Sequence, residues 1–81
     1  MNKSPTAHFF DRRQQRNVTL MHAYLAVDSP DYISTKRNKR NNLCYVHRKV
    51  INHEWIEVVC VLQGSTQVLI TVWKNPEKYY D

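Results

Sequence analysis

The stretch Ile56-Glu57-Val58-Val59-Cys60-Val61-Leu62 decides the fold class of this 81-residue chain. Its apolar residues occupy both alternating sets of positions, and a strand with this pattern is buried on both of its faces. We therefore expect it to be the central strand of a sheet. Helices should cover one face of that sheet, and the other face should be partly shielded.

Two further segments show the alternation of apolar and polar residues that is typical of strands. With the central segment, the predicted strands span about residues 43–50, 55–62 and 67–73. The connections Ile51-Asn52-His53-Glu54 and Gln63-Gly64-Ser65-Thr66 are short enough for hairpins. The sequence therefore predicts an antiparallel meander, to which Tyr32-Ile33 can add a short edge strand.

Helical signals precede residue 43. Ser4-Pro5 resembles a helix start, with Ser at the N-cap and Pro at the first helical position, where a missing N–H costs nothing. This helix is expected to run to about residue 15 or 16 with its apolar face centred on Phe10. Asn17 suits the left-handed residue that closes a helix.

A second helix is predicted at about residues 20–27. Thr19 is its expected N-cap, and Asp28-Ser29-Pro30 ends it because Pro cannot continue a helix. Its apolar stripe comprises Leu20, Met21, Tyr24, Leu25 and Val27. The fold class that follows is α+β, with two N-terminal helices packed on a three- to four-stranded antiparallel sheet in a single domain spanning residues 1–81.

Length and composition set limits on the kind of protein. A chain of 81 residues supports one domain with a small core, and no apolar run approaches the roughly 20 residues of a membrane span. The first residues lack the apolar core of a signal peptide, so a cytoplasmic protein is expected. Cys44 and Cys60 are expected to be free thiols that are buried or half-buried. The histidines and cysteines lack metal-site spacing, so we expect no metal and no cofactor.

Charge is distributed unevenly along the chain. Residues 1–50 carry ten Lys or Arg against three acids, a balance of +7, whereas residues 51–81 carry two Lys against four acids, a balance of −2. The sum is the net charge of +5. A compact basic half on a small domain is typical of proteins that bind nucleic acid or another polyanion.

His8, Arg12 and Arg16 form the main candidate site. In a helix, steps of four residues place them in one row, each about 40° around from the last. Like charges at this spacing repel each other, and no acid at matching spacing relieves them. A bound anion would do so, although a basic face that is simply solvated is the plainer interpretation.

The order of motifs resembles a family of small bacterial domains, mostly without assigned function, that begin with His-Ala-x-x-Arg-x-x-x-Arg-Gly-Ile. The matching residues are His8-Phe9-Phe10-Asp11-Arg12, Arg16-Asn17-Val18-Thr19, Asp28-Ser29-Pro30-Asp31 and Val68-Leu69-Ile70-Thr71-Val72-Trp73. The chain departs from the pattern at Phe9, where the family often has Ala, and at Asn17, where it has Gly. The family is similar in architecture to the RelE/ParE and BrnT-like toxins of toxin-antitoxin modules, many of which cleave RNA without a metal.

This resemblance implies a RelE-like fold, an RNA substrate, metal-independent endoribonuclease activity and a cognate antitoxin as protein partner. Such cleavage needs a proton acceptor, a proton donor and cations at the phosphate. His8 is the first candidate for proton transfer, and Arg12 and Arg16 would hold phosphate oxygens. The alternative is a regulator without catalysis, which binds nucleic acid or, like a ParE-type inhibitor, a host protein.

Further candidates lie on the predicted strands and loops. His47 and Lys49 share a strand face with Tyr45, and Lys74 ends the last strand. We expect Lys49 and Lys74 to assist catalysis and His47 to contact nucleic acid, although an exposed strand face without a role is the plainer interpretation. The remaining expected RNA contacts are Lys36, Arg37, Lys39, Arg40 and Tyr79. Trp55 and Trp73 are expected to pack on the outer edge of the sheet.

Overall fold

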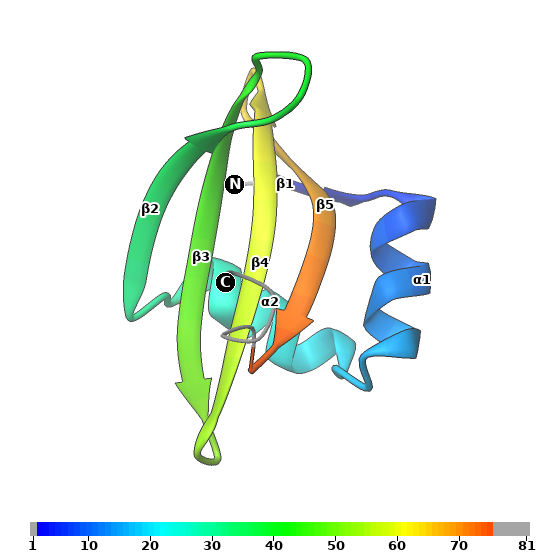
Figure 1. Ribbon diagram of the computed structural model, residues 1–81, viewed down its shortest axis with the longest axis vertical. Coiled ribbons are helices and arrows are strands. Elements are labelled where there is room, and N and C mark those ends of the chain that lie inside the picture. The colour runs from blue at the N-terminus through cyan, green and yellow to red at the C-terminus, as the bar shows by residue number, and fades with distance from the viewer. Residues whose placement is uncertain (1, 76–81) are drawn as a thin grey trace.

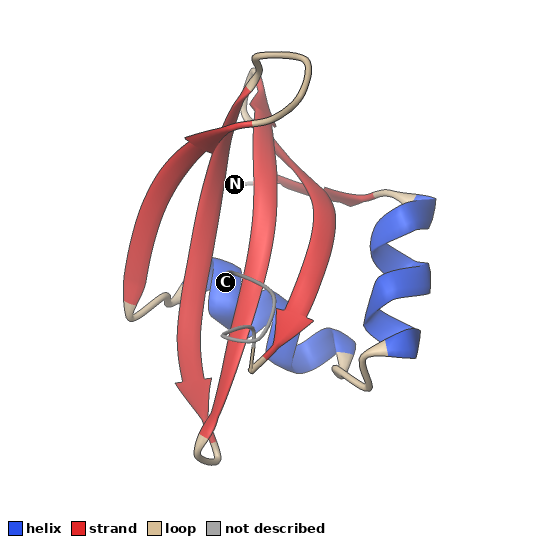
Figure 2. Cartoon of the chain, in the orientation of Figure 1, coloured by secondary structure: helices blue, strands red, loops and turns tan. Residues whose placement is uncertain are grey.

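The computed structural model describes residues 2–75 and contains two helices and five strands (Figures 1 and 2). In chain order these are β1 (Asn2–Pro5), α1 (Ala7–Gln15), α2 (Leu20–Asp28), β2 (Tyr32–Arg37), β3 (Leu43–Ile51), β4 (Glu54–Gln63) and β5 (Thr66–Lys74). They form one sheet with the order β1-β5-β4-β3-β2. The predicted α+β class is confirmed, and β4 is the central strand as expected.

Both predicted hairpins are present. Asn52 and His53 connect β3 to β4 and have φ angles of 52° and 66°. Two consecutive left-handed residues make a type I′ turn, whose twist matches that of the strands it joins. Gly64, with φ 61°, opens the turn between β4 and β5. The predicted meander therefore forms the antiparallel part of the sheet, with β2 at its edge.

The first strand was not predicted. β1 pairs with β5 in parallel, so the sheet has five strands and is mixed, and the expectation of three or four antiparallel strands is wrong in this respect. The predicted helix start at Ser4-Pro5 is also wrong, because Thr6 is the N-cap and accepts a hydrogen bond from Phe9 N at 3.1 Å. The Thr6 amide and hydroxyl both donate to Leu69 O, at 3.1 and 2.9 Å. Pro5 fits an edge strand, where a missing donor is tolerated.

The docking of β1 also sets the rotation of α1. Phe9 is fully buried, whereas Phe10, on which the predicted apolar face was centred, is 42 % exposed. Neighbouring residues in a helix lie about 100° apart, so only one of two adjacent phenylalanines faces the sheet. The helix ends where predicted, and Asn17 adopts the left-handed conformation with φ 56°.

The second helix occupies the predicted segment, and part of its predicted apolar stripe, Tyr24 and Val27, lies against the core. Thr19 caps the helix by accepting a hydrogen bond from His22 N at 3.1 Å. Its buried residues are Ala23, Ala26 and Val27, whereas Leu20, Met21 and Leu25 of the predicted stripe are exposed. Small residues let a helix approach a sheet closely, so the larger apolar side chains were a misleading guide to the buried face.

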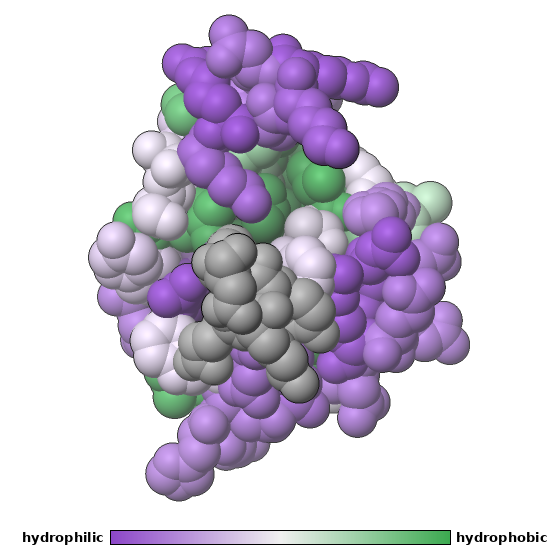
Figure 3. Space-filling model, viewed as in Figure 1, coloured by the Kyte–Doolittle hydropathy of each residue, from purple (hydrophilic) through white to green (hydrophobic). Residues whose placement is uncertain are grey.

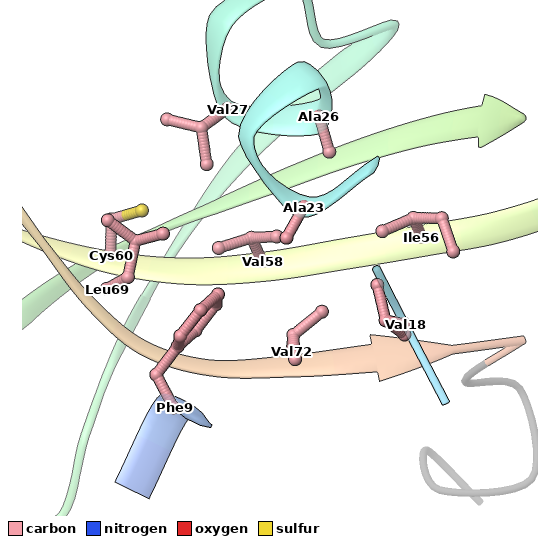
Figure 4. Packing of buried hydrophobic residues seen from close by; sticks show 10 residues of the cluster. All are labelled: Phe9, Val18, Ala23, Ala26, Val27, Ile56, Val58, Cys60, Leu69 and Val72. Atoms are coloured by element: carbon pink, nitrogen blue, oxygen red, sulfur yellow. The ribbon is translucent and has the colours of Figure 1, made fainter. Parts of the chain in front are cut away.

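The main core lies between the two helices and one face of the sheet (Figure 4). In Figure 4, side chains of α2 lie over β4, and Phe9 enters from α1 at the side of β5. Its buried members are Phe9, Val18, Ala23, Ala26, Val27, Ile56, Val58, Cys60, Leu69 and Val72. Neither helix in the described part of the chain has the length and apolarity needed to cross a membrane.

Candidate nucleic-acid interface

The face of the sheet that points away from the helices, which we call the open face, carries a second and smaller apolar cluster. It consists of Cys44, Val46 and Val59, with Val61 packed against them. Val46 and Val59 lie opposite each other on β3 and β4. In Figure 3 an apolar area on this side of the molecule lies directly below the hydrophilic side chains at the top of the view. An apolar surface with a polar border is typical of binding sites.

A row of large side chains crosses the open face from strand to strand. Tyr32 of β2 lies opposite Arg48 of β3, Arg48 opposite Glu57 of β4, and Glu57 opposite Trp73 of β5. Arg16, which caps the C-terminus of α1, extends the row by placing its guanidinium 3.3 Å from the centre of the Trp73 ring. We call these five residues the cross-sheet row. It contains two aromatic rings and three charged groups, with Arg48 and Glu57 adjacent at its centre.

The centre of the row is a buried carboxylate with few partners. The Glu57 side chain is 2 % exposed, and Arg48 Nη2 lies 3.5 Å from Glu57 Oε2. Arg48 Nε is buried and has no hydrogen-bond partner within residues 2–75. The Arg48 guanidinium also lies 4.8 Å from the centre of the Trp55 ring. Since a carboxylate offers about four acceptor positions, this one long contact within residues 2–75 uses only a small part of the capacity of Glu57.

The predicted row on α1 is only partly brought to this face. His8 is exposed, Arg12 donates to Gln15 Oε1 at 2.9 Å, and Arg16 donates to Thr71 Oγ1 at 3.1 Å and to Val72 O at 2.9 Å. Steps of about 40° rotate the row from solvent toward the sheet. Of the three candidates, Arg16 alone reaches the open face, where it also satisfies a backbone carbonyl at the edge of β5.

Lys49 and Lys74, the two predicted catalytic lysines, lie on the helix face instead. Both are opposite Ile56, one on β3 and one on β5. Lys49 donates to Ser29 O at 2.8 Å, just after α2, and Lys74 lies 3.5 Å from Asn17 O, just before α2. Their carboxylate partners, at 3.4 and 3.2 Å, are Asp31 and Glu54 respectively. These contacts hold the two ends of α2 on the sheet, away from the open face.

His47 is buried on the helix face as well. His47 lies opposite Val58 of β4. The Nδ1 atom of His47 has no hydrogen-bond partner in the described part of the chain. Burial lowers the pKa of His47, although hydrogen bonds with the backbone of Val58 and Tyr45 oppose this effect. This position does not suit the predicted contact of His47 with nucleic acid. Tyr79, predicted to stack on a base, lies outside the described residues.

The predicted basic residues cluster at one end of the open face. Lys36 and Arg37 end β2, and Lys39 and Arg40 follow in the turn that leads to β3, a group that we call the basic loop. Asn38 orders the turn, because its Oδ1 accepts hydrogen bonds from the amides of residues 40 and 42, both at 2.9 Å. In Figure 3, hydrophilic side chains border the apolar area at this end of the molecule.

The remaining chemistry-bearing side chains form no second site in residues 2–75. Cys44 and Cys60 are free and buried, as predicted, and they lie on opposite faces of the sheet. Burial raises the pKa of Cys60 to about 12, so its thiol is unreactive near neutral pH. No three His, Cys, Asp or Glu side chains of the described residues converge in a way that could hold a metal ion.

Four members of the cross-sheet row were not among the predicted site residues. These are Tyr32, Arg48, Glu57 and Trp73. Trp55 and Trp73 were expected to pack on the outer edge of the sheet, and an arginine guanidinium lies over each of the two rings. A signal was present in the sequence, since Glu57 is the one charged residue inside the most apolar segment, and the alternation of β3 places Arg48 on the same face as Cys44 and Val46.

Comparison with known proteins gives one match. Residues 6–74 match the model of a family described as a domain of unknown function, DUF4258. No curated protein and no solved structure matches the chain. The predicted resemblance to a domain family without assigned function is confirmed, whereas the likeness to RelE/ParE and BrnT-like toxins stays a prediction. Since the match spans both helices, β2 to β5 and the whole open face, the chain belongs to the DUF4258 family.

Proposed function

We propose that this protein binds single-stranded RNA on the open face of its sheet. The observation that carries the proposal is the cross-sheet row, which places two aromatic rings and two guanidinium groups on one face of the sheet, with the basic loop at the other end of the same face. Aromatic side chains on a sheet surface stack with unpaired bases, and arginine planes do so as well. The same arginines can hold phosphate oxygens in their planar forks.

Exposure of the rings supports stacking. Tyr32 is 59 % exposed and Trp55 is 38 % exposed, so a base can reach part of each ring. The apolar area beside them can receive the edge of a sugar or base. Because bases in a duplex are already stacked and paired, this surface favours a single strand over a double helix.

The distribution of paired charges supports the same surface. Asp28, Asp31 and Glu54 each form an ion pair with a lysine, and these three pairs lie on the helix side of the sheet. By contrast, the side chains of Lys39 and Arg40 contact no acceptor within residues 2–75 and extend into solvent. Positive charge is therefore left available for phosphate at the end of the open face. We choose RNA over DNA as the proposed ligand because of the resemblance to RNA-cleaving toxins that the sequence predicts.

A titration with a labelled single-stranded RNA, followed by fluorescence anisotropy, tests the proposal. Replacing both exposed rings, as Tyr32→Ala with Trp55→Ala, should weaken binding by at least tenfold, since each base stacked on an aromatic ring contributes about 1–3 kcal/mol. Met21→Ala is the matched control, because Met21 is an exposed apolar residue on α2, on the other side of the sheet. Equal affinities for all three proteins would contradict the proposal, and duplex RNA and single-stranded DNA serve as competitors.

Cleavage of the bound RNA without a metal is the second candidate function. One observation favours it. His8, Arg12 and Arg16 form one row along α1, and this row runs from the solvent-exposed side of the helix to the open face. Incubation of total RNA with the protein in excess chelator should yield fragments, and His8→Ala should slow this by about 10²- to 10⁴-fold. Full activity of His8→Ala and Arg12→Ala would reject a catalytic row. The toxin role and an antitoxin partner depend on this activity and stay predictions.

A further inference from the structure

We infer that the open face selects guanine, with Glu57 reading the base at the position that the Arg48 guanidinium occupies in the free protein. This inference rests on the proposed binding of single-stranded RNA. It adds a base preference and names the residue that sets it.

The geometry at Arg48 shows what kind of group the site holds. Its guanidinium lies 4.8 Å from the centre of the Trp55 ring and 3.5 Å from Glu57 Oε2. The position therefore takes a flat group that both contacts an indole ring and directs N–H donors at a buried carboxylate. The Arg48 side chain is 30 % exposed, so it borders solvent and can move aside.

Guanine matches this position better than the other three bases. Its N1–H and N2–H₂ groups form a pair of adjacent donors on one edge of a flat ring, which repeats the donor arrangement of a guanidinium. A carboxylate can accept both donors at once. Adenine and cytosine present a donor beside an acceptor on the corresponding edge, and uracil presents a single N–H between two acceptors.

The contacts of the free protein explain why an exchange is favourable. Glu57 is buried with one contact at the limit of hydrogen-bond length, and Arg48 Nε is buried without a partner in residues 2–75. Guanine would give the carboxylate two short donors and release Arg48 to contact a phosphate or the guanine O6 and N7 atoms. Both buried groups would then be better satisfied than they are without ligand.

The experiment compares uridine tracts that carry a single central guanine, adenine or hypoxanthine, with binding measured by fluorescence anisotropy. The wild-type protein should bind the guanine strand about tenfold to a hundredfold more tightly than the adenine strand, the discrimination typical of a bidentate base contact. Hypoxanthine keeps N1–H and lacks the N2 amino group, so its strand should bind with intermediate affinity. Glu57→Gln should bind guanine and adenine strands equally, because an amide places a donor against the donors of guanine.

Glu54→Gln is the matched control, since it makes the same change three residues earlier on β4, at a half-exposed residue paired with Lys74 on the helix side of the sheet. It should keep the full guanine preference. Retained preference in Glu57→Gln, or equal binding of guanine and adenine strands by wild type, would overturn the inference while leaving RNA binding in place. Absence of any RNA binding would overturn the proposed function as well. If Glu57→Gln does not fold, the hypoxanthine comparison on the wild-type protein decides.

Discussion

On the helix face of the sheet, Ile56, Val58 and Cys60 of β4 are covered by α2, while on the open face the same strand presents Glu57 and Val59. Charged side chains have different partners on the two faces. Lysines on the helix face donate to backbone carbonyls at the ends of α2 and pair with carboxylates at the surface. Their hydrogen bonds are local and serve the packing of a helix.

On the open face the guanidinium groups of Arg16 and Arg48 lie over tryptophan rings, and the buried Glu57 carboxylate makes one ion-pair contact of 3.5 Å within residues 2–75. Such groups cost stability when a ligand does not satisfy them. The comparison indicates that the helix face is built for stability and the open face for binding. Arg16 is the one member of the row that serves both purposes, because it also donates to a carbonyl of β5.

The largest expected effect lies on the helix face. Phe9→Ala should lower the free energy of unfolding by about 3–5 kcal/mol, because it opens a cavity in the main core. Phe10→Ala, the same change at the next position, removes a ring that is 42 % exposed and should cost less than about 1 kcal/mol. Urea unfolding followed by circular dichroism measures both. Similar costs for the two variants would contradict the assignment of Phe9 to the core.

A smaller effect is expected on the open face. Arg48→Met should destabilise the protein by about 2–3 kcal/mol, because it leaves the Glu57 carboxylate buried without its cation. The double change Arg48→Met with Glu57→Leu should recover most of this loss, since it removes the isolated charge together with its partner. A double-mutant cycle measured by urea unfolding gives the coupling energy. A double variant less stable than Arg48→Met would show that the pair stabilises the open face.

The parts of the fold that were predicted correctly depend on local patterns. Alternation and short turns mark β3, β4 and β5, and the caps at Thr19 and Asn17 are properties of single residues in their local context. β1 could not be predicted in this way. Its four residues, mostly polar and ending in Pro5, become a strand only through pairing with residues 66–69 of β5.

The candidate site was difficult to predict for the same reason. Glu57 and Trp73 are far apart in sequence and become neighbours through the register of β4 and β5, which includes an irregularity between Val59 and Cys60. Arg16 reaches Val72 across 56 positions of the chain. Helical spacing was enough to identify the row on α1. The orientation of that row depends on β1, so the sequence could not predict which of its residues face solvent and which reach the open face.

The pH dependence of stability tests the burial of His47 on the helix face, and the expected effect is smaller than those above. Burial lowers its pKa in the folded protein, so the unfolded chain takes up a proton first as pH falls below about 6.5. The stability that depends on the neutral imidazole is therefore complete above that pH and decreases below it. His47→Gln should flatten the dependence of the free energy of unfolding on pH between about 7 and 5. An unchanged slope in His47→Gln would contradict this explanation.

Substitutions in the basic loop should have the smallest effect on stability. Their effect on RNA binding should nevertheless be measurable. Lys39→Gln should change the free energy of unfolding by less than about 0.5 kcal/mol, because the side chain contacts no acceptor within residues 2–75. Each lost phosphate contact to a single strand should reduce the slope of log affinity against log salt by about 0.7, and adding Arg40→Gln should double the change.

Lys3→Gln separates a phosphate contact from a general effect of net charge. It removes the same charge as Lys39→Gln, but Lys3 pairs with Asp28 and lies near the Tyr24 ring on the helix side of the sheet. Because counterions are released where a cation meets a phosphate, the location of the charge decides the slope, and Lys3→Gln should leave it unchanged. Equal reductions in Lys3→Gln and Lys39→Gln would mean that overall charge attracts the RNA, and the distinction between the two faces would not extend to binding.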